Sequence, residues 1–135
     1  MAKKQWSYSP KKTSKVQVLD ATKYAIMTKA IALVETVLKP NNIKPPPENP
    51  QFNYIVDIYT KWYRHYFYFY AKYCCPTPDC IAPFFDVGVA RLEYTAPNQF
   101  SLSYMRHTDQ WFEIYTGLSL EECLGAIESE PLFLM

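Results

Sequence analysis

Strict alternation of tyrosine and phenylalanine in the run Tyr66-Phe67-Tyr68-Phe69-Tyr70 is the feature that most constrains the fold. Successive side chains of a β-strand point to opposite faces of the sheet, so this run predicts phenylalanines on one face and tyrosines on the other. A phenylalanine face requires a core, whereas a tyrosine face is apolar but keeps hydroxyl groups for water or a partner. The chain therefore predicts a β-sheet with two unlike faces, and we expect a binding function on the tyrosine face.

Composition favours one globular domain with no obligatory cofactor. The 135 residues are enough to bury a core without a disulfide or metal, and aromatic residues make up 17% of them. Only three glycines are present, against eleven prolines. That glycine count excludes a phosphate-cradling loop, and no H-E-x-x-H or G-x-S-x-G motif occurs. We therefore expect no cofactor and no metal, and no sequence motif identifies a catalytic residue.

Positive charge is concentrated at the N-terminus of the chain. The net charge is +1, yet residues 1–19 contain five lysines and no acidic residue. We predict that residues 1–18 form a disordered basic arm, with residues 19–135 as a single α+β domain. The Ser9-Pro10 turn with the lysines after it could lie in an A·T-rich minor groove, but a solvated arm is the favoured interpretation. The lysines that could contact a polyanion are Lys3, Lys4, Lys11, Lys12 and Lys15.

Two helices flank the expected strands. Asp20 is a candidate N-cap for a first helix, which Pro40 should end. Its expected apolar stripe is Tyr24, Met27, Ile31, Val34 and Leu38. Residues 39–50 form a proline-rich connection, interpreted as a stiff strap rather than as a ligand for a proline-recognising domain. The sequence Ser119-Leu120-Glu121-Glu122 is a capping box that begins a second helix, which ends before Pro131.

Five strands are expected between the helices, over residues 52–62, 66–73, 87–95, 100–106 and 111–115. Short turns join them, so the fold class is α+β, a five-stranded antiparallel meander with two helices packed on one face. The face expected under the helices comprises Tyr54, Val56, Ile58, Phe67, Phe69, Ala90, Leu92, Phe100, Leu102, Tyr104, Phe112 and Ile114. The opposite face should then show Tyr59, Tyr66, Tyr68, Tyr70, Lys72, Arg91, Trp111 and Tyr115, together with Lys61.

The second half of the chain resembles a small uncharacterised bacterial family, a domain of unknown function. The resemblance is carried by Arg91-Leu92-Glu93-Tyr94, by the stretch from Phe100 to Trp111, by Ser119–Glu122 and by Glu130-Pro131-Leu132-Phe133. It covers residues 25–135 and implies a helix, a proline stretch, a meander and a short Leu-Glu-Glu helix in a bacterial cytosol. It carries over no catalytic residue, and Cys74-Cys75 and the basic arm lie outside its pattern.

The tyrosine face supports three hypotheses about function. The leading one is an interaction module that forms a homodimer, because tyrosine and tryptophan are enriched at interfaces. The alternative for the same face is cover within the chain, by the strap or the arm. The first alternative is a nucleic-acid-associated protein, with bases stacked on the sheet aromatics and the arm on phosphates. The second is an enzyme with an unrecognised pocket, for which His107 and Asp109 are the only nearby candidates. Of these two residues, Asp109 is expected instead to shape a turn.

The cysteines and the lack of apolar segments complete the sequence-based predictions. No export signal and no membrane-spanning run is present, so we expect a cytoplasmic protein with no membrane partner. Four cysteines in that setting predict reduced thiols. The alternatives are a zinc site that includes Cys75 and Cys80, and a vicinal disulfide between Cys74 and Cys75.

Overall fold

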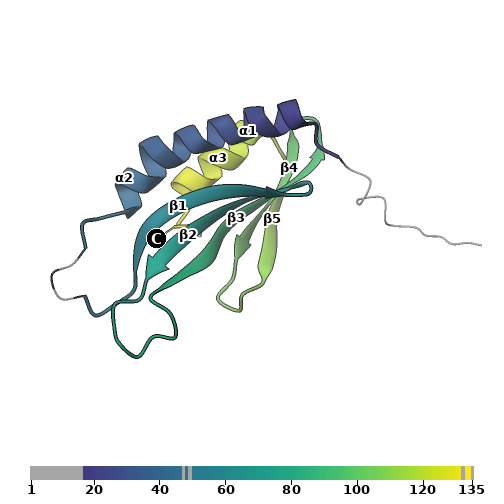
Figure 1. The fold of residues 1–135 in the computed structure, drawn as a ribbon. Coiled ribbons are helices and arrows are strands. Elements are labelled where there is room, and N and C mark those ends of the chain that lie inside the picture. Colours follow the sequence, from purple (N-terminus) through teal and green to yellow (C-terminus); the bar gives the residue numbers. More distant parts are fainter. Residues whose placement is uncertain (1–16, 47, 49, 132, 135) are drawn as a thin grey trace, which may run out of the picture.

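The computed structural model describes residues 17–46, 48, 50–131 and 133–134, and shows the predicted α+β meander (Figure 1). Five antiparallel strands follow one another in the order β1-β2-β3-β4-β5. The strands are β1 (Tyr54–Tyr63), β2 (Tyr66–Cys74), β3 (Phe84–Ala96), β4 (Gln99–Met105) and β5 (Trp111–Leu118). The helical segments are α1 (Asp20–Leu33), the π-helical turn η2 (Val34–Leu38), α2 (Lys39–Asn42) and α3 (Leu120–Ser129). The predicted fold class is confirmed.

Tight turns set the register of three hairpins. Arg64, Asn98 and Asp109 each adopt a positive φ, of 57°, 54° and 63°. Asn and Asp tolerate this left-handed conformation because their short polar side chains bond locally. The amide of Asp109 also donates to the carbonyl of Arg106 over 2.9 Å, so Asp109 lies in the β4–β5 turn as predicted.

The first helix buries only part of the predicted stripe, namely Val34 and Leu38. Its fully buried residues are Ile26, Ala30, Val34 and Leu38, an i, i+4 series. Tyr24 and Ile31 of the predicted stripe are 68% and 42% exposed. The prediction favoured the largest apolar residues, whereas the small residue Ala30 is completely buried. The N-cap assignment was also wrong, because Asp20 is already helical and follows Leu19.

The prediction that Pro40 ends this helix was wrong, because the helix continues through Pro40. A proline has no N–H for the carbonyl four residues earlier and its ring clashes with that carbonyl. The chain widens here into the π-helical turn η2, in which the amide of Lys39 donates to the carbonyl of Val34. The helix then continues through α2 to Asn42, whose side chain donates to the carbonyl of Leu38 over 2.8 Å. Figure 1 shows α1 and α2 as one long rod across the sheet.

A β-bulge changes which residues of β1 face the helices. The pairing of β1 with β2 shifts between Ile55 and Asp57, so one extra residue stands in β1. Ile55 and Ile58 are buried as a result, and the prediction that Tyr54 and Val56 lie with Ile58 on the covered face was wrong. Strict alternation holds only where no bulge intervenes, and a bulge has no strong signature in a single sequence.

The core lies between the helices and one face of the sheet. Phe67, Phe69, Leu92 and Leu102 are fully buried there, as predicted. The capping box of α3 is confirmed, because the Ser119 hydroxyl accepts from the Glu122 amide and the Glu122 carboxylate accepts from the Ser119 amide. The α3 residues that pack on the sheet are Leu120, Cys123 and Ile127.

Candidate functional site

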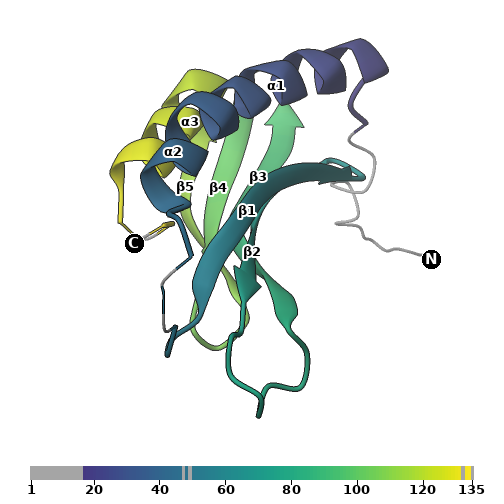
Figure 2. The ribbon, with the colours of Figure 1, turned by 60° about the vertical axis from the view of Figure 1, so that its left-hand side comes forward.

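The candidate site is the sheet face that points away from the helices, here called the open face. Figure 2 shows α1, α2 and α3 gathered on the opposite side of the sheet. No helix of the described residues covers the open face. Strand register assigns to this face Tyr54, Asp57, Tyr59, Lys61, Tyr63, Tyr66, Tyr68, Tyr70, Lys72, Cys74, Phe84, Asp86, Gly88, Arg91, Glu93, Ser101, Ser103, Met105, Trp111 and Glu113.

Four tyrosines on β1 and β2 form a continuous stack. The ring centroids of Tyr59 and Tyr70 are 5.5 Å apart at 21°, and those of Tyr68 and Tyr70 are 5.7 Å apart at 27°. Tyr66 extends the row, 6.2 Å from Tyr68. Offset rings at these separations attract one another beyond the area they bury. Because the ring faces turn toward neighbouring rings, the stack presents ring edges and hydroxyl groups outward.

Arg91 lies between two aromatic rings at the centre of the face. Its guanidinium carbon is 4.8 Å from the ring centroid of Tyr66 and 5.4 Å from that of Trp111. Such cation–π contacts hold the planar guanidinium in place. The described residues include no ion-pair partner for Arg91, and its buried Nε has no hydrogen-bond partner. This is a positioned cation with hydrogen-bonding capacity to spare.

Trp111 reaches this position because β3 contains a glycine. A Cβ on Gly88 would lie 2.8 Å from both Cη2 and Cζ2 of Trp111 and 3.0 Å from the Met105 side chain. The Trp111 ring therefore lies directly over the β3 backbone, 5.7 Å from Tyr68. Sequence reasoning placed Trp111 on this face but missed Gly88 and Met105. A glycine inside a predicted strand was the signal that indicated a close approach.

Burial raises the pKa of several phenols on the open face. Desolvation is the largest cause for Tyr59, Tyr66 and Tyr70. The negative charges of Asp86, beside Tyr59 and Tyr70, and of Glu93, beside Tyr66, add to it. A raised phenol pKa keeps these hydroxyl groups neutral at neutral pH, so they can both donate and accept hydrogen bonds.

Opposite charges are balanced on the open face. The cations are Lys61, Lys72 and Arg91, and the carboxylates are Asp57, Asp86, Glu93 and Glu113, of which Asp57 also pairs with Lys39 at the sheet edge. Lys61 lies over the Tyr70 ring at 5.5 Å, and Lys72 over the Phe84 ring at 5.1 Å. Glu93 pairs with His65 at 3.1 Å beside the β1–β2 turn. The surface is aromatic with an even mix of charges, rather than basic.

One predicted member of this face lies on the other side of the sheet. Tyr115 is opposite Leu102 and on the helix side, where its hydroxyl donates to Glu130 over 2.8 Å. The prediction was wrong because the β4–β5 register shifts between Leu102 and Ser103, which reverses the alternation beyond Glu113. The other seven predicted residues of the binding face are together, and their role in binding stays a prediction.

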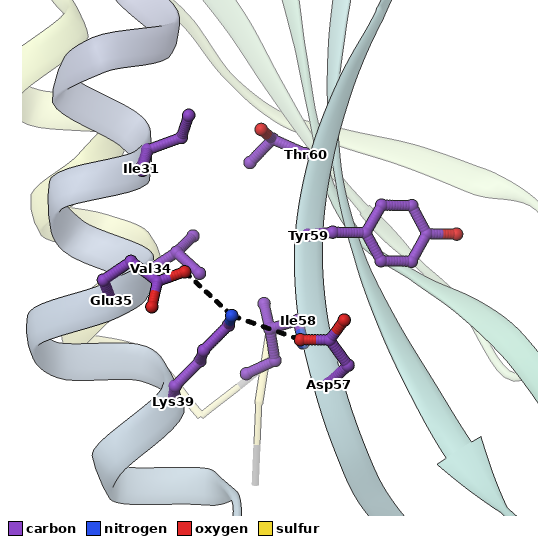
Figure 3. A pocket seen from close by; sticks show the side chains of 8 residues that line it. All are labelled: Ile31, Val34, Glu35, Lys39, Asp57, Ile58, Tyr59 and Thr60. Atoms are coloured by element: carbon purple, nitrogen blue, oxygen red, sulfur yellow. Dashed lines mark hydrogen bonds and ion pairs between the residues drawn. The ribbon is translucent and has the colours of Figure 1, made fainter.

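A small groove lies between the first helix and the free edge of β1 (Figure 3). Its volume is ≈ 240 Å³, below the roughly 300–1,000 Å³ usual for ligand pockets. Lys39 lies in it, with its ammonium 2.8 Å from Glu35 and 3.2 Å from Asp57. These carboxylates, Glu35 foremost, raise the pKa of Lys39. The two ion pairs cross the groove and join α2 and η2 to β1.

The loop between β2 and β3 corrects the prediction of reduced thiols. Cys75 and Cys80 form a disulfide, whereas Cys74 and Cys123 are free. The vicinal Cys74–Cys75 alternative is therefore wrong, and the cytoplasmic location stays a prediction. In the part of the chain that the structure describes, no three His, Cys, Asp or Glu residues gather as metal ligands. No helix among these residues is long and apolar enough to span a membrane.

The remaining candidates add no chemistry to the open face. The arm lysines, from Lys3 to Lys15, lie outside the described residues, and their role stays a prediction. His107 and Asp109 are exposed turn residues, with no hydrogen bond between their side chains. The less exposed histidine of the described part is His65, whose half-buried side chain pairs with Glu93.

Comparison with known proteins gives a family without a known activity. No curated protein and no solved structure matches the chain. A family model described as a domain of unknown function (DUF3024) matches residues 18–134. That span covers every described helix and strand, and it confirms the resemblance to a family of unknown function noted in the second half of the chain. The chain therefore belongs to the DUF3024 family, a domain of unknown function.

Proposed function

We propose that this protein is an interaction module that forms a homodimer through its open face. The observation that carries the proposal is the row of Tyr59, Tyr70, Tyr68 and Tyr66, which leads to Arg91 and Trp111 on a face without helices. Tyrosine, tryptophan and arginine are the residues that dominate binding energy at protein interfaces. Here they lie together and are already held in place by one another, which lowers the entropic cost of binding.

Charge balance favours a second copy of the chain as the partner. A two-fold interface places one surface patch against itself, so the patch must be complementary to itself. The open face has three cations and four carboxylates, one of which, Asp57, pairs with Lys39, so this mixed surface meets the condition without strong net repulsion. Neutral phenol hydroxyls can donate to and accept from their counterparts in the second copy.

The same features disfavour single-stranded nucleic acid as the ligand. Proteins that bind it combine a net positive groove with aromatic faces that are open to bases. On this face the carboxylates cancel the cations, and ring faces are turned toward neighbouring rings. Nucleic-acid binding through the arm and the open face remains the alternative outcome of the test.

The test compares two tyrosine substitutions at different sites. In the pair Tyr68→Glu and Tyr70→Glu, made together, each copy would bring carboxylates into the interface at a cost of about 2–5 kcal/mol. We expect sedimentation to show a wild-type dimer and a folded monomeric variant. Tyr24→Glu is the matched control, because Tyr24 is exposed on α1, on the other side of the molecule, and that variant should remain a dimer.

Two results would contradict the proposal. One is a wild-type protein that sediments as a monomer at high concentration. The other is a folded double variant that remains as dimeric as the wild type. In the first case, binding of oligonucleotides to the wild type, lost in the double variant, would assign the open face to nucleic acid instead.

A further inference from the structure

The Cys75–Cys80 disulfide lies at the end of the sheet, away from the core. Figures 1 and 2 both show the loop between β2 and β3 extending from the sheet on the side opposite the helices. No residue from Pro76 to Pro83 belongs to the buried core. The bridge closes a ring of only six residues, with the two Cα atoms 6.3 Å apart. The fold of the domain therefore does not depend on it.

The two bridged cysteines, Cys75 and Cys80, are accessible to solvent, in contrast to the core thiol of Cys123. Cys75 and Cys80 are partly exposed, whereas Cys123, a residue of α3, is fully buried. Burial, with a smaller effect of the Glu122 charge, raises the pKa of the Cys123 thiol to about 12. Exchange requires a thiolate that can be approached by a second sulfur. Cys74 is free and partly exposed but has no bonded sulfur, so among the described cysteines only the loop pair is both accessible and joined sulfur to sulfur.

The loop keeps the two sulfurs close by means other than the bridge. The amide of Cys75 donates to the carbonyl of Pro83 over 2.8 Å, which extends the β2–β3 ladder. The amide of Cys80 donates to the carbonyl of Thr77 over 3.4 Å, and the Thr77 hydroxyl is 3.2 Å from the Cys80 sulfur. Pro76 and Pro78 stiffen the turn between them. A reduced pair would remain close together and could close again.

The loop displays an apolar side chain whose position depends on this turn. Ile81 follows Cys80 directly and is fully exposed, and Phe84 and Phe85 at the start of β3 are also exposed. A fully exposed isoleucine beside two exposed phenylalanines is an uncommon concentration of apolar surface at a loop tip.

We propose that Cys75 and Cys80 form a reversible thiol–disulfide site whose redox state sets the shape of the loop that displays Ile81. The proposal does not rest on the proposed dimer. In the reducing direction, the thiolate of a low-molecular-weight or protein thiol attacks one sulfur, the Cys75–Cys80 bond breaks, and a mixed disulfide forms. A second thiolate attacks that mixed disulfide, releases an oxidised disulfide and leaves two protein thiols, which have taken up two electrons and two protons. The reverse sequence restores the bridge.

The test equilibrates the full-length protein with mixtures of reduced and oxidised glutathione, traps free thiols by alkylation and maps them by mass spectrometry. We expect Cys75 and Cys80 to change together, in one two-electron step, between dithiol and bridge. Cys74 should be alkylated throughout, and Cys123 only after denaturation. Cys74→Ser is the matched control and should give the same titration curve. A pair that remains dithiol, or remains bridged, over the whole range of mixtures would overturn the site.

A second measurement tests the effect on the loop. Cleavage at Ile81 by thermolysin, which cuts before large apolar residues, should be about tenfold faster in the Cys75→Ser, Cys80→Ser double variant than in the oxidised wild type, because local opening becomes easier. The oxidised Cys74→Ser variant should be cleaved at the wild-type rate. Equal cleavage rates for the double variant and the oxidised wild type would show that the bridge does not set the shape of the loop.

Discussion

The two faces of the sheet are built from neighbouring residues of the same strand, yet they have opposite physical character. Phe67 and Phe69 are completely buried, with their rings edge to face at 86°. Tyr68, which stands between them in sequence, is partly exposed and lies nearly parallel to Tyr70 at 27°. A single hydroxyl group per ring distinguishes the two sets. On β2 the helices cover the phenylalanine side, because burying an unpaired hydroxyl costs free energy.

The largest expected effect is a difference in stability between truncating a side chain on the covered face and truncating one on the open face. Phe67→Ala should lower the free energy of unfolding by about 3–5 kcal/mol, because it leaves a cavity in the core under the helices. Tyr68→Ala, one residue along the strand, should lower it by about 1–2 kcal/mol, because its ring is only partly buried. Urea unfolding of both variants checks the comparison. Equal losses would mean that the open face is as important to the fold as the core.

The next effect tests the support of Trp111 on the open face. In Gly88→Ala the new methyl group would collide with the Trp111 ring, which we expect to cost about 1–3 kcal/mol and to weaken self-association at least about tenfold. Gly125→Ala in α3 is the matched control, because nothing lies within 4 Å of its added Cβ. That change should instead stabilise the helix by up to about 1 kcal/mol. Unfolding and sedimentation measurements check both, and a neutral Gly88→Ala would contradict the packing described for Trp111.

A smaller effect tests the helical cover. Ser119→Ala removes the hydroxyl that accepts from the Glu122 amide over 3.1 Å, and should cost about 1 kcal/mol of stability. The open face is on the other side of the sheet, so self-association should not change. Ser129→Ala, near the other end of α3, is the control, because its hydroxyl donates only to the carbonyl of Gly125 within the same helix. A loss of self-association in Ser119→Ala without a loss of stability would show that the two faces are coupled.

The smallest expected effect is a loss of stability that is absent near neutral pH and appears only in alkali. Burial raises the pKa of Tyr59, Tyr66 and Tyr70 in the folded protein. Phenols of the unfolded chain ionise at about pH 10, so above that pH the unfolded state binds fewer protons than the folded one. Stability should therefore be constant below that value and fall as pH rises through the folded pKa. Unfolding at stepped pH, with tyrosinate absorbance, checks this. Tyr70→Phe should flatten the decline, and an unchanged pH profile would contradict the assigned burial.

Local sequence patterns predicted the elements whose causes are local. The Tyr/Phe alternation gave β2 and both of its faces, because a strand has a period of two. The capping box gave the start of α3, because Ser119 and Glu122 bond only to each other's backbone. Exceptions followed where a distant contact decided the outcome. Ala30, a small residue, is completely buried, and no periodicity of large apolar residues indicates that.

The composition of the open face could be predicted, but its geometry could not. Seven of the eight predicted residues lie there, because alternation assigns them from each strand separately. Tyr115 was misplaced because a register shift in β5 depends on how β4 and β5 pair. The contact of Trp111 with Gly88 spans three strands, so it exists only once the sheet is assembled.

By itself, the sequence determined the antiparallel meander, the two unlike faces of its sheet and the capped C-terminal helix, since each follows from spacing and propensity within a short segment. Tertiary structure decided that the helix passes through Pro40 and that Ile55 rather than Val56 enters the core. It also decided that Arg91 is held between Tyr66 and Trp111. These outcomes depend on which surfaces meet when the chain closes, and packing between distant residues can outweigh a local preference of about 1–3 kcal/mol.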